Sequence, residues 1–115
     1  MPNADFSIKA GDTASSIYAT LENSGGTPVD IQGATVVFKM APLSGGTPTL
    51  VANGTVTQIG NGTATNTVGD VQYNWATAPA TAGWFNAEWE VTYVGGSVQT
   101  FPNTGYVLVE VTGQL

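Results

Sequence analysis

The feature that most constrains this chain is an alternation of apolar and polar residues that recurs from one end of the sequence to the other. Alternating side chains point to opposite faces of a β-strand, so each such run predicts a strand with one buried and one solvated face. The pattern predicts these inward positions: Phe6, Ile8, Ile17, Ala19, Leu21, Ala34, Val36, Phe38, Met40, Val71, Tyr73, Trp75, Phe85, Ala87, Trp89, Val91, Tyr93, Val107, Val109 and Val111.

Glycine and proline interrupt the chain between these runs, with fifteen Gly and six Pro in the sequence. Asn53-Gly54 predicts a two-residue hairpin turn with positive φ at both residues, and Asn61-Gly62 repeats the signal. Gly95-Gly96 predicts a third tight hairpin, and Gly33 a sharp turn after residues 29–31. Phe101-Pro102-Asn103 should break the sheet before the last strand.

Many short strands separated by turns predict an all-β fold built from two packed sheets. The expectation is an immunoglobulin-like antiparallel β-sandwich of about 7–9 strands. The chain has no Cys, so the sandwich has no disulfide. With 115 residues and no break in composition, residues 1–115 are expected to form a single domain.

The residues that are missing exclude several functions. The sequence has no His, Cys or Arg, which excludes imidazole-based triads and Cys/His zinc sites. Two lysines against eight acidic residues give a net charge of −6. Nucleic acids and anionic membranes attract positively charged proteins, so the charge argues against binding to either. No apolar run approaches the ~20 residues of a membrane span, and residues 1–5 do not resemble a signal peptide. No cofactor is predicted.

The remaining titratable residues are mostly carboxylates. Glu88 and Glu90 would place their Cα atoms about 6.6 Å apart on one face of a strand, a spacing compatible with glycoside hydrolysis. The favoured interpretation is a charged, solvated face. Asp12, Asp30 and Asp70 lie near turns, where they could bind calcium, but without Asp-x-Asp spacing they are expected to brace the turns. The chain is therefore expected not to be an enzyme.

Three aromatic residues are candidates for recognition: Tyr18, Trp75 and Trp84. Trp84 occupies one of the alternating positions of its strand that are predicted to face solvent. An indole there could stack on a sugar, fill a pocket on a neighbouring subunit, or cover an end of the sandwich. The Asn-Gly-Thr sequences at residues 53–55 and 61–63 match the glycosylation motif. They are interpreted as a coincidence of turn and strand preferences.

Six segments carry a resemblance to a known family: FSIKAGDT at residues 6–13, IYATL at 17–21, TPVDIQGATVVFKM at 27–40, VQYNW at 71–75, TAGWFNAEWEVTY at 81–93 and QTFPNTGYVLVEV at 99–111. Together they resemble the immunoglobulin-like domain of tailed-phage virion proteins, notably the N-terminal domain of baseplate upper proteins. The resemblance implies a structural protein of the virion, in the tail, baseplate, neck or capsid surface. Its partners would be itself or other virion proteins, as a homo-oligomer in the particle.

Contact with such partners is expected at sheet edges and loop ends, because edge strands present unpaired N–H and C=O groups. The expected contact segments are the N-terminal residues up to Lys9 and residues 107–115. The candidate contact or ligand residues are Trp84, Tyr18, Trp75, Phe6 and Val109. The alternative function is a module that binds a host-surface glycan or receptor through exposed aromatic residues.

Overall fold

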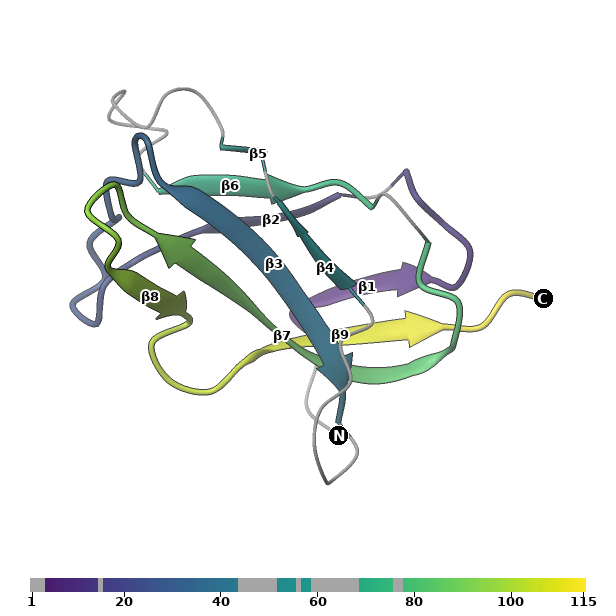
Figure 1. Ribbon diagram of the computed structural model, residues 1–115. Coiled ribbons are helices and arrows are strands. Elements are labelled where there is room, and N and C mark those ends of the chain that lie inside the picture. Colours follow the sequence, from purple (N-terminus) through teal and green to yellow (C-terminus); the bar gives the residue numbers. More distant parts are fainter. Residues whose placement is uncertain (1–3, 15, 44–51, 56, 59–68, 76–77) are drawn as a thin grey trace.

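The computed structural model describes residues 4–14, 16–43, 52–55, 57–58, 69–75 and 78–115 (Figure 1). These residues contain strands and no helix, which confirms the all-β prediction. The strands are β1 (Phe6–Lys9), β2 (Ile17–Thr20), β3 (Thr35–Pro42), β4 (Ala52–Thr55), β5 (Thr57–Gln58), β6 (Asp70–Tyr73), β7 (Gly83–Thr92), β8 (Val98–Phe101) and β9 (Val107–Thr112).

The strands form two sheets. The larger has the order β1-β9-β7-β3-β4, with β8 also paired to β7, and the smaller has the order β2-β6-β5. Figure 1 shows β2 and β6 lying across the layer formed by β3, β7 and β9. Strands with one apolar and one polar face require a second layer, because each sheet buries its apolar face against the other.

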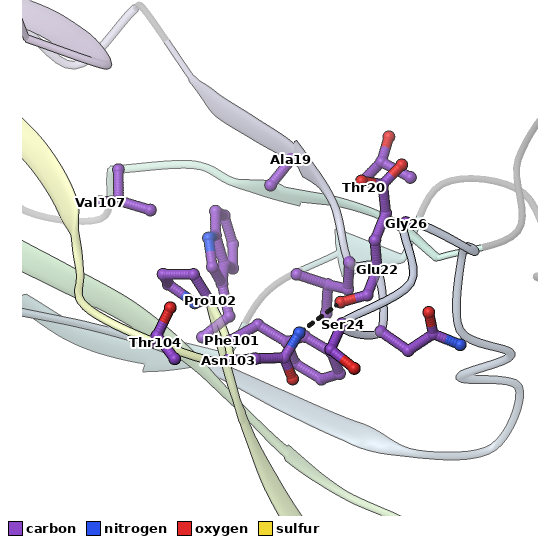
Figure 2. A pocket seen from close by; sticks show the side chains of 13 residues that line it. Ala19, Thr20, Glu22, Ser24, Gly26, Phe101, Pro102, Asn103, Thr104 and Val107 are labelled. Atoms are coloured by element: carbon purple, nitrogen blue, oxygen red, sulfur yellow. Dashed lines mark hydrogen bonds between the residues drawn. The ribbon is translucent and has the colours of Figure 1, made fainter.

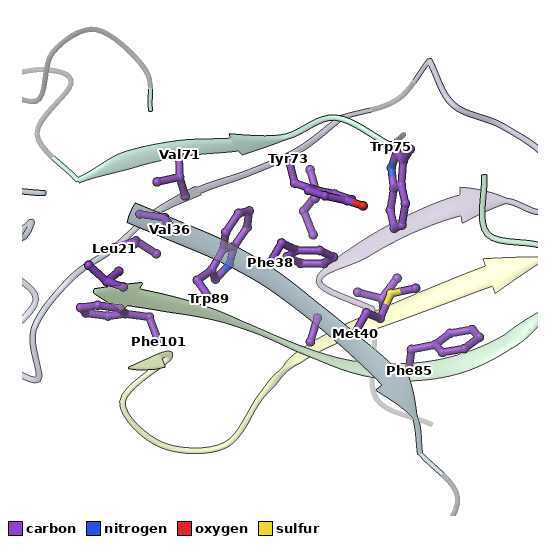
Figure 3. Close-up of a cluster of buried hydrophobic side chains, with 14 of the residues drawn as sticks. Leu21, Val36, Phe38, Met40, Val71, Tyr73, Trp75, Phe85, Trp89 and Phe101 are labelled. Carbon is purple, nitrogen blue, oxygen red and sulfur yellow. The ribbon is translucent and has the colours of Figure 1, made fainter. Parts of the chain in front are cut away.

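The inward positions predicted from alternation are confirmed in both sheets. Most are buried, and the remaining four, Phe6, Ala19, Tyr93 and Val107, pack against the core. Phe38 of the larger sheet stacks on Tyr73 of the smaller with ring centroids 4.7 Å apart (Figure 3). Its ring also lies 4.9 Å from Trp89 and 6.0 Å from Trp75. This aromatic cluster joins the two layers.

The prediction that the sheets are purely antiparallel is wrong at one edge. β1 pairs with β9 in parallel, from Phe6 opposite Val109 to Lys9 opposite Thr112. Alternation fixes which face a side chain occupies but not the direction of the neighbouring strand. As a consequence β9 lies between β1 and β7, so the predicted contact segment 107–115 does not offer a free edge along β9.

The turn predicted at Asn53-Gly54 is also wrong. Both residues lie inside β4, where Asn53 is opposite Lys39 and Gly54 is opposite Phe38. Pairing with the long strand β3 outweighs the local turn preference of an Asn-Gly pair. Asn61-Gly62 lies outside the described residues.

The predicted turns at the other glycines are confirmed. β7 and β8 form a hairpin, in which Gly96 N–H donates to Tyr93 O at 2.8 Å and Tyr93 N–H donates to Ser97 O at 2.8 Å. Gly96 has φ +93°, the left-handed conformation that closes a three-residue hairpin loop. Gly33 likewise has a φ of +78° in its turn.

The predicted break before the last strand is confirmed as well. β8 ends at Phe101 and β9 begins at Val107, yet both pair with β7. Because β3 occupies the other edge of β7, β8 and β9 follow one another along the same edge. The intervening residues 102–106 leave the ladder as a bulge. This bulge forms one wall of the site described next.

Candidate interaction surface

A pocket of about 500 Å³ opens between the two sheets beside the bulge. Residues 19–24 and 26, from β2 and the loop after it, form one wall, and residues 101–104 and 107 form the other (Figure 2). Trp89 lies between them and is only 1% exposed. Among the described residues of the lining, Glu22 is the one titratable side chain.

Side-chain amides hold the two walls together. Asn103 Nδ2 donates to Glu22 O at 2.9 Å, and Gln99 Nε2 donates to Asn103 Oδ1 at 3.3 Å. Asn23 Oδ1 accepts from the backbone N–H groups of Gly25 at 2.9 Å and of Thr27 at 3.1 Å. This is the local turn that an Asn side chain favours, and it fixes the loop that faces the bulge.

Two buried indole N–H groups in the core, those of Trp75 and Trp89, have no hydrogen-bond partner among the described residues. The Trp89 nitrogen is covered by protein, so it offers no direct contact to a ligand in the pocket. Apart from Glu22, the described lining is therefore the neutral polar and apolar surface of the two walls. Such a surface can bind by shape and by neutral hydrogen bonds.

The free edge of β2 borders this pocket. Within the described part of the chain, β2 is paired with β6 on one side and with no strand on the other. Leu21 N–H donates to Gly69 O at 2.8 Å, which places residues 17, 19 and 21 in the hydrogen-bonded pairs of the antiparallel ladder. The backbone groups of Tyr18 and Thr20 therefore point away from β6, toward the open edge.

The strand β8 presents a second edge on the larger sheet. The Tyr93–Ser97 hydrogen bond places residues 97, 99 and 101 in the bonded pairs with β7. The backbone groups of Val98 and Thr100 thus point outward. Neither β2 (IYAT) nor β8 (VQTF) contains a charged residue or a proline, the usual devices that protect an edge, whereas β1 ends with Lys9.

The structure places Tyr18 and Trp84 on different layers. Tyr18 is 62% exposed on the smaller sheet. Trp84 is half-buried on the larger sheet, where its alternation with the buried Phe85 puts it on the outer face. Because β2 and β7 belong to different sheets, the two residues do not lie side by side on one surface of this structure.

Three of the other predicted contact residues lack the exposure that a contact residue is expected to have. Trp75 is 6% exposed and Val109 is fully buried, so their selection as contact residues is wrong. Both continue the inward alternation of their strands. Phe6 is half-buried and stacks on Trp75 with ring centroids 6.4 Å apart. Of the five candidates, Tyr18 is the one with a largely exposed side chain.

The carboxylates of β7, Glu88 and Glu90, are interpreted from the sequence as part of a charged, solvated face. Glu90 Oε2 lies 3.0 Å from Lys39 Nζ, and Glu88 is directly opposite Lys39 in the ladder. The ion pair is partly exposed, with side chains 27% and 34% accessible, so it contributes little to stability.

The three aspartates brace the structure. Asp30 Oδ1 accepts from Gln32 N–H at 2.9 Å, Asp70 Oδ1 accepts from Thr20 Oγ1 at 2.6 Å, and Asp12 Oδ1 accepts from Gln114 Nε2 at 3.2 Å. The described ranges hold no group of three or more acidic residues placed to bind a metal ion.

A polar network covers the β2–β6 pair. Ser16 Oγ donates to Asn74 Oδ1 at 2.5 Å, and Gln72 Nε2 donates to the same oxygen at 2.7 Å. A shallow hollow of about 330 Å³ lies beside it, lined by Tyr18, Ala19, Thr20 and Asp70. The sequence predicted Tyr18 as a candidate but not these neighbours, because strand pairing between residues about 50 positions apart brings them together.

Burial raises the pKa of two tyrosines, Tyr73 and Tyr93. A phenol whose pKa is raised by folding stays protonated in the folded state at a pH where the unfolded chain ionises. Its stabilising contribution is therefore complete below the ordinary pKa of 10.0 and is lost as the pH rises above it.

We expect the substitution Tyr73→Phe to reduce the fall in the free energy of unfolding at high pH. Urea unfolding of the wild-type chain should show a free energy of unfolding that falls as the pH rises through about 10 and beyond. Phe cannot ionise, so the variant should lose less stability over the same pH range. Equal losses in the two proteins would show that Tyr73 ionises as freely in the folded as in the unfolded chain.

Comparison of the chain with protein-family models, with curated proteins and with solved structures finds no match in any of the three. In the ranges that the structure describes, no helix has the length and hydropathy needed to cross a membrane.

Proposed function

We propose that this chain is an immunoglobulin-like structural protein of a tailed-phage virion and that it acts through assembly contacts. The strand order supports the fold assignment. In variable-type immunoglobulin domains one sheet has the order G-F-C-C′ and the other contains B, E and D. Here β9-β7-β3-β4 and β2-β6-β5 follow that order. The six segments that resemble phage virion domains support the virion assignment.

The observation that carries the assembly role is the pair of uncharged edges, β2 and β8, beside the pocket. An added strand satisfies the outward backbone groups of an edge, so such edges are suited to joining chains. A catalytic role finds less support: among the lining residues that the structure describes, the one titratable group is Glu22, and Glu90 is engaged by Lys39. Only 9% of the residues are charged, which limits repulsion between neighbouring copies.

Density-gradient purification of the phage that encodes the chain, followed by quantitative peptide mass spectrometry, tests this proposal. We expect the chain to co-purify at a fixed ratio to the major capsid protein through successive gradients. An abundant non-structural phage protein serves as the control for contamination. Loss of the chain together with that control would contradict a structural role.

The second candidate function is recognition of a host-surface glycan or receptor. The observation that favours it is the exposed ring of Tyr18 beside the Ser16–Asn74–Gln72 network, since sugars stack on aromatic rings and bond to neutral amides. Binding to host polysaccharide that is lost in Tyr18→Ala and kept in Trp84→Ala would support this site. Absence of binding to any host polysaccharide would remove it.

A further inference from the structure

We propose that the free edge of β2 pairs antiparallel with β2 of a second copy of this chain, with Ala19 facing Ala19 of that copy across a two-fold axis. The proposal deepens the assembly role above and rests on it, because it names the edge, the partner and the register. It replaces the terminal segments that the sequence suggested as the contact.

The backbone of β2 fits this arrangement. Tyr18 and Thr20 direct their N–H and C=O groups away from β6. If Tyr18 of each copy lies opposite Thr20 of the other, the two pairs exchange four hydrogen bonds. The ladder between the two copies would end at Glu22, because the carbonyl oxygen of Glu22 already accepts a hydrogen bond from Asn103.

The same register makes compatible pairs on both faces. Tyr18 lies beside Thr20 of the second copy on the outer face, and Ile17 lies opposite Leu21 on the inner face. Glu22 falls opposite Ser16, so no two like charges meet in the ladder. The outer row across the joined sheet reads Asp70, Thr20, then Tyr18 and Gln72 of the second copy, which keeps the two Asp70 side chains in different rows.

Both hollows on this side of the molecule border the same edge, because Ala19 and Thr20 line each of them. In the proposed register, Tyr18 of the second copy stands over the hollow formed by Tyr18, Thr20 and Asp70. Its ring is 62% exposed in one copy alone and would be covered in the pair. Recognition by strand addition works in this way: main-chain bonds provide affinity, and hollows for alternate side chains provide specificity.

Two other edges, those of β1 and β8, suit self-pairing less well. β1 carries Lys9, and a charged side chain on an edge strand disfavours the addition of another strand. Two β8 strands centred on Gln99 would place the buried Phe101 opposite Ser97 and run into the bulge at Pro102. A β2 pair adds a continuous six-strand layer, β5-β6-β2-β2-β6-β5, across the two copies.

A disulfide test measures the register directly, because the chain has no cysteine of its own. Facing residues of a non-hydrogen-bonded pair have Cα atoms about 4.5 Å apart, within the range a disulfide spans. We expect Ala19→Cys to form a covalent dimer upon mild oxidation at high protein concentration. Tyr18→Cys is the control: its thiol is more exposed, yet its copies would lie diagonally, about 7–8 Å apart, so it should cross-link several-fold more slowly.

A second experiment measures self-association without cysteine. Sedimentation over a wide concentration range should show reversible association of the wild-type chain, weak because the edge is short. Thr20→Pro removes one outward N–H and should abolish association, whereas Thr100→Pro makes the same change on the outward edge of β8 and should leave it intact. Circular dichroism checks that both variants fold.

Three outcomes would overturn the proposal: faster cross-linking of Tyr18→Cys than of Ala19→Cys, equal effects of the two prolines, or a wild-type chain that stays monomeric at the highest concentration. In the last case the occupant of the edge is a strand from another protein. The virion assignment fails separately, by absence of the chain from purified particles, so the two results are distinguishable.

Discussion

Phe38→Ala should destabilise the folded chain by about 3–5 kcal/mol, a large part of the roughly 5–15 kcal/mol available to a domain. Phe38 is fully buried, and its ring contacts Tyr73 of the opposite sheet and Trp89 of its own at centroid distances of 4.7 and 4.9 Å. Alanine removes both contacts and leaves a cavity between the layers. Urea unfolding followed by tryptophan fluorescence measures the loss.

Tyr18→Ala is the matched control for this prediction. It also removes an aromatic ring from a strand, but one that is 62% exposed. Its expected effect on the free energy of unfolding is below about 1 kcal/mol. If the two variants lost similar stability, Phe38 would not be the centre of packing between the two sheets.

Gly69→Ala is the second substitution with a large expected effect. A Cβ at this position would lie 2.7 Å from Leu21 O and 3.2 Å from Val29 N, both backbone atoms. The same backbone carries the bonds from Leu21 N–H to Gly69 O and from Val29 N–H to Leu21 O. With a φ of +78° in addition, we expect a loss of about 2–4 kcal/mol, measured by urea unfolding.

Gly26→Ala separates the clash from the backbone strain. Gly26 has a φ of +85°, but a Cβ at this position would meet no atom within 4 Å. This variant should lose only the strain of a left-handed alanine, about 1 kcal/mol. A Gly69→Ala variant as stable as Gly26→Ala would contradict the close approach of Leu21 and Gly69.

The buried face of each strand could be predicted from the sequence because alternation depends only on local order. Val36, Phe38 and Met40 are buried where the pattern places them, and so are Phe85, Ala87 and Trp89. Turns that require a positive φ were also predictable where glycine supplies it, as at Gly33 and Gly96.

The pairing of strands could not be predicted in the same way. The parallel contact of β1 with β9 joins residues about 100 positions apart, and no local pattern encodes that neighbour. The same limit applies to Asn53-Gly54, whose turn preference is outweighed by pairing with β3. The prediction of residues 107–115 as an edge failed for this reason, because β1 covers β9.

The candidate site was predictable in part. Tyr18 was identified as an exposed aromatic, and its exposure follows from alternation with Ile17 and Ala19. The pocket was not, since it depends on Asn103 reaching Glu22 from 81 positions away. Trp75 and Val109 were selected as contacts although their own alternation places them inward, and both are buried.

The proposal that this chain acts by assembling with neighbours is tested most directly by a cryo-EM reconstruction of the intact phage particle. We expect density for the chain in a repeating layer, with the edge of β2 joined to β2 of an adjacent copy. A particle without this chain, or one in which every copy stands apart with its sheet edges in solvent, would contradict the proposal.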